Sequence, residues 1–224
     1  MAGTDTTTEW TERIVGLDRL WSLTRGSPEV RIAILDGPPE RNAIAGALAQ
    51  SGVVEHGTHV HSIVSGSRDG GVVGIAPQCS ALSIPIFSAE DGGDVCTQAR
   101  LAEAICSALD AGANIINISA AQQAGALTLS DELRNALQAA SARDVLVVAA
   151  TGNHGTASDT LPAAAPGMLA VGAHDESGQP LLSSNWGPNQ RTQGLIATGE
   201  DVPGACVGGG VCRASGSSFA TAAV

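Results

Sequence analysis

The chain of 224 residues has no tyrosine and no lysine, and aromatic residues make up only 2% of it. A hydrophobic core must therefore be built mainly from Ala, Val, Leu and Ile. All 11 cationic residues are Arg, and against 22 acidic residues they leave a net charge of −11, which disfavours nucleic acid and anionic membranes as partners. With 43% hydrophobic and 15% charged residues, the composition is not that of a disordered acidic protein.

Long apolar runs are also missing. No stretch of about 20 apolar residues occurs, and the opening "MAGTDTTTEWTERIVGLDRLW" has neither a basic start nor an apolar h-region. We therefore expect no signal peptide, no membrane span and a cytoplasmic location. The five Cys residues form no C-x-x-C pair; Cys206 and Cys212 flank "VGGGV" and could close a disulfide, but free thiols are favoured in a cytoplasmic protein.

Short apolar runs alternate with Ala-rich segments of helical period. The expected strands are 30–35, 81–87, 114–119, 144–150 and 167–173, and the expected helices are 96–112 and 129–143, the latter with Ser130 or Asp131 as its cap. Strands that are apolar almost throughout indicate a parallel sheet covered on both faces, an α/β fold. We expect one domain over 1–224, with 1–28 as an N-terminal arm in which "LDRLWSL" forms one or two helical turns.

Polar residues follow the carboxyl ends of three of these strands. Asp36 follows the first, Ser119 the third, and Thr151, Gly152 and Asn153 the fourth. In such sheets, functional groups gather in the crevice beyond the carboxyl ends of the strands.

Three histidines lie in "EHGTHVHSIVSG" (55–66), which the pattern predicts to be a helix beginning near His56. Only His56 and His59 share a helix face, and no H-E-x-x-H occurs, so we expect no metal there. In "SGSRDGGVVGIAP" (65–77) the one carboxylate is Asp69, too few for a calcium site. No cofactor is expected.

The stretch "RASGSSFATAAV" (213–224) places three serine hydroxyls within four residues. A serine becomes a nucleophile when an imidazole takes its proton and a carboxylate orients that imidazole. Asp36, His56 and Ser218 provide these groups. Taken singly, Asp36 suits a cap or turn, His56 a surface histidine, and Asn153 a turn residue in "TGNHG".

Together, "IAILDG", "HGTHV", "AATGNHG" and "SGSSFATAAV" resemble the four signature segments of subtilisin-like serine proteases. The resemblance implies a three-layer αβα sandwich with a mostly parallel sheet. It also implies Asp36 as the orienting acid, His56 as the base, Ser218 as the nucleophile and Asn153 as an oxyanion-hole donor. Ser217 stands where this family usually has Thr.

"GIAPQCSALSIPIFS", "AGANIINIS", "LAVGAHDESGQP" and "SNWG" are similar to the proteases that mature cyanobactins, peptides cut from ribosomally made precursors. The resemblance implies a peptide or precursor-peptide substrate, whereas the absence of nucleic acid and membrane partners is expected from the net charge. The peptide would bind along two edges; these edges are Phe87, Ser88 and Ala89 on one side and Ser119, Ala120, Ala121, Thr151 and Gly152 on the other. Ala120 and Ala121 replace the usual Gly-Gly, so we expect a small residue before the cut.

Two departures from the family pattern bear on activity. Only 20 positions separate Asp36 from His56, too few for the helical insertion that shields the acyl-enzyme in the macrocyclases, so hydrolysis is expected over cyclisation. The chain also ends six residues after Ser218, within the helix expected to carry the nucleophile. A partner could therefore be its own C-terminal fragment. The alternatives are a macrocyclase or transpeptidase, and an inactive subtilase that acts as a peptide-binding module.

Overall fold

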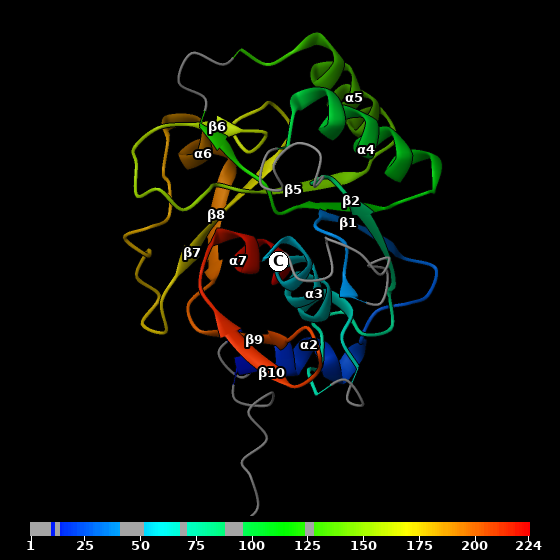
Figure 1. The fold of residues 1–224 in the computed structure, drawn as a ribbon, viewed down its shortest axis with the longest axis vertical. Helices are drawn as coiled ribbons and strands as arrows, with labels where there is room; N and C mark the ends of the chain where they lie inside the picture. Colours follow the sequence, from blue (N-terminus) through cyan, green and yellow to red (C-terminus); the bar gives the residue numbers. More distant parts are fainter. Residues whose placement is uncertain (1–9, 12–13, 41–51, 68–70, 88–95, 124–127) are drawn as a thin grey trace, which may run out of the picture.

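The computed structural model describes residues 10–11, 14–40, 52–67, 71–87, 96–123 and 128–224 (Figure 1). Its main sheet has six parallel strands in the order β2-β1-β3-β5-β7-β8. These strands are β1 (Arg31–Asp36), β2 (Ser80–Pro85), β3 (Ile115–Ile118), β5 (Leu146–Ala150), β7 (Leu169–His174) and β8 (Gly194–Thr198).

Helices cover both faces of this sheet. Figure 1 shows α4 (Gln98–Asp110) and α5 (Asp131–Ala142) on one side, and α3 (Gly52–Ser65) and α7 (Ser217–Ala222) on the other. Strand β1 serves both cores because successive side chains of a strand point to opposite faces. Ala33 and Leu35 pack in the cluster beneath α4 and α5, whereas Ile32 and Ile34 pack in the cluster beneath α3 and α7. The fold is a three-layer α/β sandwich around a parallel main sheet, as the sequence predicts.

Smaller elements surround the sandwich. They are α2 (Leu17–Leu23), α6 (Pro188–Gln193), the antiparallel pair β4 (Gln122–Gln123) and β6 (Thr160–Leu161), and the hairpin β9 (Val202–Ala205) and β10 (Val211–Ala214). None of the helices in the described ranges is long and apolar enough to cross a membrane.

The predicted elements are confirmed to within a few residues at each end, and the predicted helical turns at "LDRLWSL" are α2. Ser130 is the cap of α5, because its hydroxyl accepts the N–H of Leu133 at 3.2 Å. One boundary differs clearly. Helix α3 runs from Gly52, a turn earlier than the predicted start near His56, because Val53 and Val54 are buried in the structure and extend its apolar face.

Candidate active site

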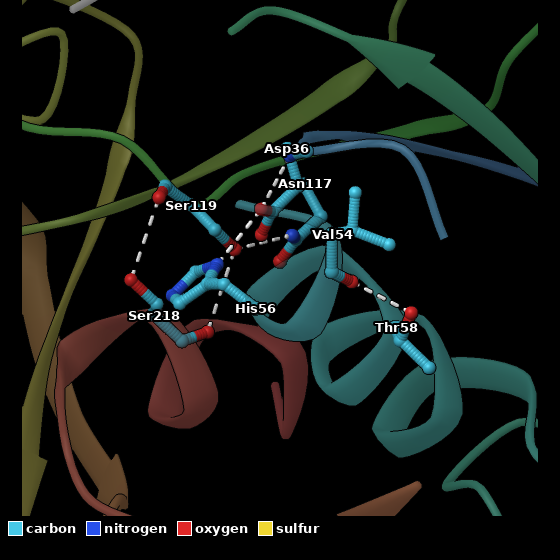
Figure 2. Close-up of polar contacts among 8 residues, drawn as sticks. Asp36, Val54, His56, Thr58, Asn117, Ser119 and Ser218 are labelled. Atoms are coloured by element: carbon cyan, nitrogen blue, oxygen red, sulfur yellow. Dashed lines mark hydrogen bonds and ion pairs between the residues drawn. The ribbon is translucent and has the colours of Figure 1, made fainter. Parts of the chain in front are cut away.

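Asp36 and His56 meet at the carboxyl end of β1. Asp36 is the last residue of this strand and is fully buried, and the Nδ1 of His56 lies 2.8 Å from its Oδ1 (Figure 2). Helix α3 comes this close because residue 57 is Gly, where a Cβ would lie 2.1 Å from the carbonyl oxygen of Gly37. When Nδ1 of His56 carries the proton, it donates to Oδ1 of Asp36, and Nε2 is then the hydrogen-bond acceptor of the neutral ring.

The environment of His56 favours its protonated form. Burial alone would lower the pKa of this imidazole, but the negative charge of Asp36 and the hydrogen bond to it outweigh burial and raise the pKa. Asp36 therefore both orients the ring and stabilises the imidazolium that forms when a proton is accepted.

Ser218 lies on the first turn of α7, next to His56. Its side chain is buried, and the ring of the following residue, Phe219, lies 5.2 Å from the ring of His56. The Oγ of Ser218 donates a hydrogen bond to the carbonyl oxygen of Ser119 at 3.4 Å (Figure 2). The structure thus brings the acid and the imidazole into contact and carries the serine on the helix whose Phe219 packs against the imidazole. The serine hydroxyl is turned to the end of β3, and no hydrogen bond joins it to His56 in the described part of the chain.

Two side chains join the loop after β5 to the start of α7. The Oδ1 of Asn153 accepts the N–H of Ser217 at 2.8 Å, and the Oγ of Ser217 accepts the N–H of Gly152 at 3.0 Å. Asn153 is exposed, and since its Oδ1 is held by α7, its Nδ2 group is left to serve as a donor. Ser218 N–H lies in the first turn of the same helix, where N–H groups lack partners within the helix.

Asn185 holds this loop in place, a role that sequence reasoning missed. The buried Asn185 accepts the N–H groups of His154 and Thr156 with its Oδ1 and donates its Nδ2 to the carbonyl oxygen of Thr151. Its own N–H donates to the carbonyl oxygen of Gly152 at 3.0 Å. A buried Asn whose partners are backbone groups about 30 residues away leaves no local pattern in the sequence.

The segments predicted to bind substrate lie close together. A Cβ at Gly152, whose φ is +92°, would lie 3.1 Å from the Cβ of Ala121, so the end of β3 and the loop after β5 nearly touch. Behind them, the fully buried Thr160 donates its hydroxyl to the carbonyl oxygen of Thr151 at 2.8 Å. The cavity beside Ala120 and Ala121 measures about 10 Å³, room for one water.

The other predicted edge is only partly visible. Phe87 is half-buried and packs against the core cluster beneath α4 and α5. Ser88 and Ala89 lie outside the described residues, as does Asp69 of the predicted empty calcium loop. The described residues hold no group of three His, Cys, Asp or Glu side chains arranged for a metal ion.

Two buried oxygen atoms beneath the site have no hydrogen-bond partner among the described residues. They are Oδ2 of Asp36 and Oδ1 of Asn117. The register of β1 and β3 pairs Asn117 with Ile34 and puts Asp36 and Asn117 on the same sheet face. The Nδ2 of Asn117 donates to the Oγ of Ser119 at 3.0 Å, so β3 supplies polar groups directly below the acid (Figure 2).

The model of the subtilase family matches residues 41–224. The chain belongs to the subtilase family. This match begins after Asp36, so the predicted role of Asp36 as the orienting acid is supported instead by its contact with His56. A curated relative, the thermophilic serine proteinase of Bacillus sp. (strain AK1), is 28% identical over 219 residues, which cover 91% of this chain and 52% of that protein.

Solved structures of cyanobactin maturation proteases are more similar. The prenylagaramide maturation protease PagA is 43% identical, with a TM-score of 0.84, and the match covers 94% of this subtilase chain and 77% of that chain. The PatG macrocyclase in complex with peptide is 29% identical, with a TM-score of 0.79, covering 95% of this chain and 78% of that one.

Proposed function

We propose that this subtilase is a serine endopeptidase that cuts a peptide precursor during the maturation of a ribosomally made natural product. The observation that carries the proposal is the 2.8 Å contact between buried Asp36 and His56, with Ser218 on the adjacent helix turn. The 43% identity to a maturation protease supports the precursor as the substrate class.

The chemistry follows from these groups. Rotation of the Ser218 side chain away from the carbonyl of Ser119 would turn Oγ toward Nε2 of His56, which takes its proton as Oγ attacks the scissile carbonyl. Nδ2 of Asn153 and the N–H of Ser218 would then donate to the oxyanion. Loss of one such donor lowers turnover by about 10²–10³, a magnitude known from subtilisin.

Labelling with a fluorophosphonate probe tests the nucleophile. The wild-type protein should be labelled, and Ser218→Ala should not be labelled and should not cut a precursor peptide. Ser215→Ala is the matched control, because this exposed hydroxyl accepts the N–H of Asp201 and should leave labelling intact. Persistent labelling of Ser218→Ala, or an unlabelled wild-type protein that still binds the peptide, would favour a peptide-binding module instead.

We also propose a small residue, such as Ala, Ser or Gly, before the cleaved bond. The support is the close approach of Ala121 to Gly152, where an added Cβ would lie 3.1 Å from that of Ala121, together with the buried Thr160 hydroxyl on the carbonyl oxygen of Thr151. Ala120→Gly combined with Ala121→Gly should raise kcat/KM for peptides with larger side chains at this position. An unchanged preference across a peptide series would contradict the assignment of this pocket.

We further propose that hydrolysis dominates over cyclisation and that the protease works in the cytoplasm. All five Cys residues are free in the structure, which suits a reducing compartment. Mass spectrometry of the products separates a linear from a cyclic peptide, and cell fractionation tests the location.

A further inference from the structure

Two thiols lie together on the hairpin of β9 and β10, outside the candidate active site. Cys212 pairs with Gly204 across the hairpin, and the N–H of Cys206 donates to the carbonyl oxygen of Gly210. This register puts Cys206 and Cys212 on the same face of the hairpin, one diagonal step apart, so their thiols are neighbours. Diagonal neighbours lie about 7–8 Å apart, just beyond the usual Cα range of a disulfide, so closing the bond requires a small backbone movement. The glycines at the hairpin tip, Gly208, Gly209 and Gly210, give the backbone the freedom for it.

Both thiols are half-buried, but they face different surroundings. Cys206 is half-buried and lines a cavity of about 430 Å³ between α3 and the hairpin tip, whose rim includes the exposed Ser67 and Gly209. Cys212 points inward, where its Sγ lies 3.8 Å from Nδ1 of His59. Because Cys206 lines the cavity and Cys212 does not, Cys206 is the thiol placed to react first with a molecule in the cavity. Burial and the neighbouring Cys206 thiol also raise the pKa of the Cys212 thiol, which disfavours its thiolate.

We propose that Cys206 and Cys212 form a thiol–disulfide exchange site that takes a low-molecular-weight disulfide as oxidant. The Cys206 thiolate attacks one sulfur of the oxidant, whose S–S bond breaks, and one thiol leaves with a proton. The Cys212 thiolate then attacks the Cys206 sulfur of the mixed disulfide and releases the second thiol. Two electrons pass from the protein to the oxidant, and the products are one protein disulfide and two small thiols.

A contact chain connects this site to the proposed catalytic groups. Nε2 of His59 donates to the carbonyl oxygen of Val202 at 3.0 Å, so its Nδ1 is an acceptor. Among the described residues the polar neighbour of Nδ1 is the Cys212 thiol at 3.8 Å, whose Sγ also lies 3.7 Å from the carbonyl oxygen of Gly204. The His59 ring packs on Phe219 with centroids 4.6 Å apart, and Phe219 packs on His56.

Oxidation removes the S–H proton of Cys212, for which Nδ1 of His59 and the carbonyl oxygen of Gly204 are the two acceptors, and so takes away the donor that faces this buried Nδ1. The ring is blocked on the side of Gly204, where a Cβ would lie 2.0 Å from it, so it can adjust only by moving against Phe219. We therefore expect the rings beneath Ser218 to shift. This consequence for activity rests on the proposed function, whereas the disulfide itself does not.

The experiment uses the whole chain, first reduced and then incubated with glutathione disulfide. Intact-mass spectrometry after alkylation should show Cys206 and Cys212 protected, and the wild-type kcat on a precursor peptide should fall by about fivefold to tenfold and recover with dithiothreitol. Unprotected thiols at high oxidant concentration would overturn the proposal while leaving the proteolytic function standing. Protected thiols in a protein that cuts no peptide would instead count against the proposed function.

Three substitutions distinguish the link through His59 from damage elsewhere. Cys206→Ser leaves the Cys212 S–H, and Cys212→Ser replaces it with an O–H donor, so both should be active and insensitive to glutathione disulfide. Cys212→Ala removes the donor and should show the lowered kcat of the oxidised wild type without any oxidant. Full activity of Cys212→Ala, or oxidant sensitivity that survives in Cys206→Ser, would overturn the link.

Discussion

His56 is the residue whose protonation decides whether the proposed catalytic groups can work. Proton transfer from Ser218 requires a neutral imidazole, and the charge of Asp36 raises the pKa of His56 against the opposing effect of burial. The value of kcat/KM should therefore rise with pH through a pKa above about 6.5, the ordinary value for His.

Asp36→Asn tests this dependence. The substitution keeps the shape of the side chain but removes the charge, so burial is left to lower the pKa of His56. The acidic limb of the kcat/KM profile should move to lower pH, and kcat should fall by about 10²–10⁴. Asp201→Asn is the control, because Asp201 pairs with Arg213 at an exposed position and its loss should leave the profile in place. If the acidic limb does not move, Asp36 does not control the pKa of His56.

At the scale of elements, the loop after β5 depends on one buried amide from another segment. Asn185→Ala removes the acceptor of two N–H groups and the donor to Thr151, so these backbone groups lose their partners and Asn153 loses its fixed position. We expect kcat to fall by about 10²-fold, comparable to loss of the oxyanion donor itself, and the melting temperature to fall.

Asn189→Ala provides the matched control for this variant. Asn189 is an exposed residue of α6 whose Nδ2 donates to Asp159, so both kcat and the melting temperature should stay near wild type. If Asn185→Ala melts earlier but keeps the wild-type kcat, Asn185 stabilises the loop without positioning Asn153.

The elements that sequence reasoning found are those whose surroundings leave a pattern in the chain. Strands β1, β3 and β5 are buried on both faces, so their sequences are apolar almost throughout. Helix α5 could be predicted because the capping residue Ser130 precedes an apolar stripe of helical period. Strand β8 was not predicted, because it is the last strand of the sheet and Leu195 and Ile196 remain exposed. The hairpin of β9 and β10 contains Pro, Gly and Cys and has no alternating pattern.

The candidate site divides in the same way. Asp36, His56 and Ser218 stand in sequence contexts that mark them out, and the structure brings the first two into contact. Asn185, Thr160 and His59 act through partners that are distant in sequence, so their roles follow only from three-dimensional contacts. The details around Ser88 and Ala89 stay predictions.

At the scale of the whole molecule, the α3 and α7 layer contains two histidines with opposite effects on stability. For His56 the pKa is raised in the folded state, so its contact with Asp36 stabilises the fold fully below pH of about 6.5 and less as pH rises through the raised pKa. For His59, burial is the main cause that lowers the pKa to about 4, with a smaller contribution from the charge of His56, despite the hydrogen bond to Val202.

The unfolded chain therefore protonates His59 at pH values where the folded protein does not. Between pH of about 6.5 and about 4 the unfolded state binds the extra proton, so the free energy of unfolding should fall by roughly 2–3 kcal/mol as the solution is acidified. Urea unfolding at a series of pH values measures this slope. In His59→Gln the slope should become shallower, although the variant is less stable at neutral pH.

Leu133→Ala supplies the comparison for lost stability alone. This buried residue of α5 lies beneath the opposite face of the sheet, so its removal should cost about 2–5 kcal/mol at every pH and leave the slope unchanged. A slope equally steep in His59→Gln would mean that the acid sensitivity arises elsewhere. If the slope is lost in His59→Gln and kept in Leu133→Ala, the acid sensitivity arises in the layer of α3 and α7, which also carries His56 and Ser218. Acid would then weaken this layer and protonate the proposed base His56 over the same pH range.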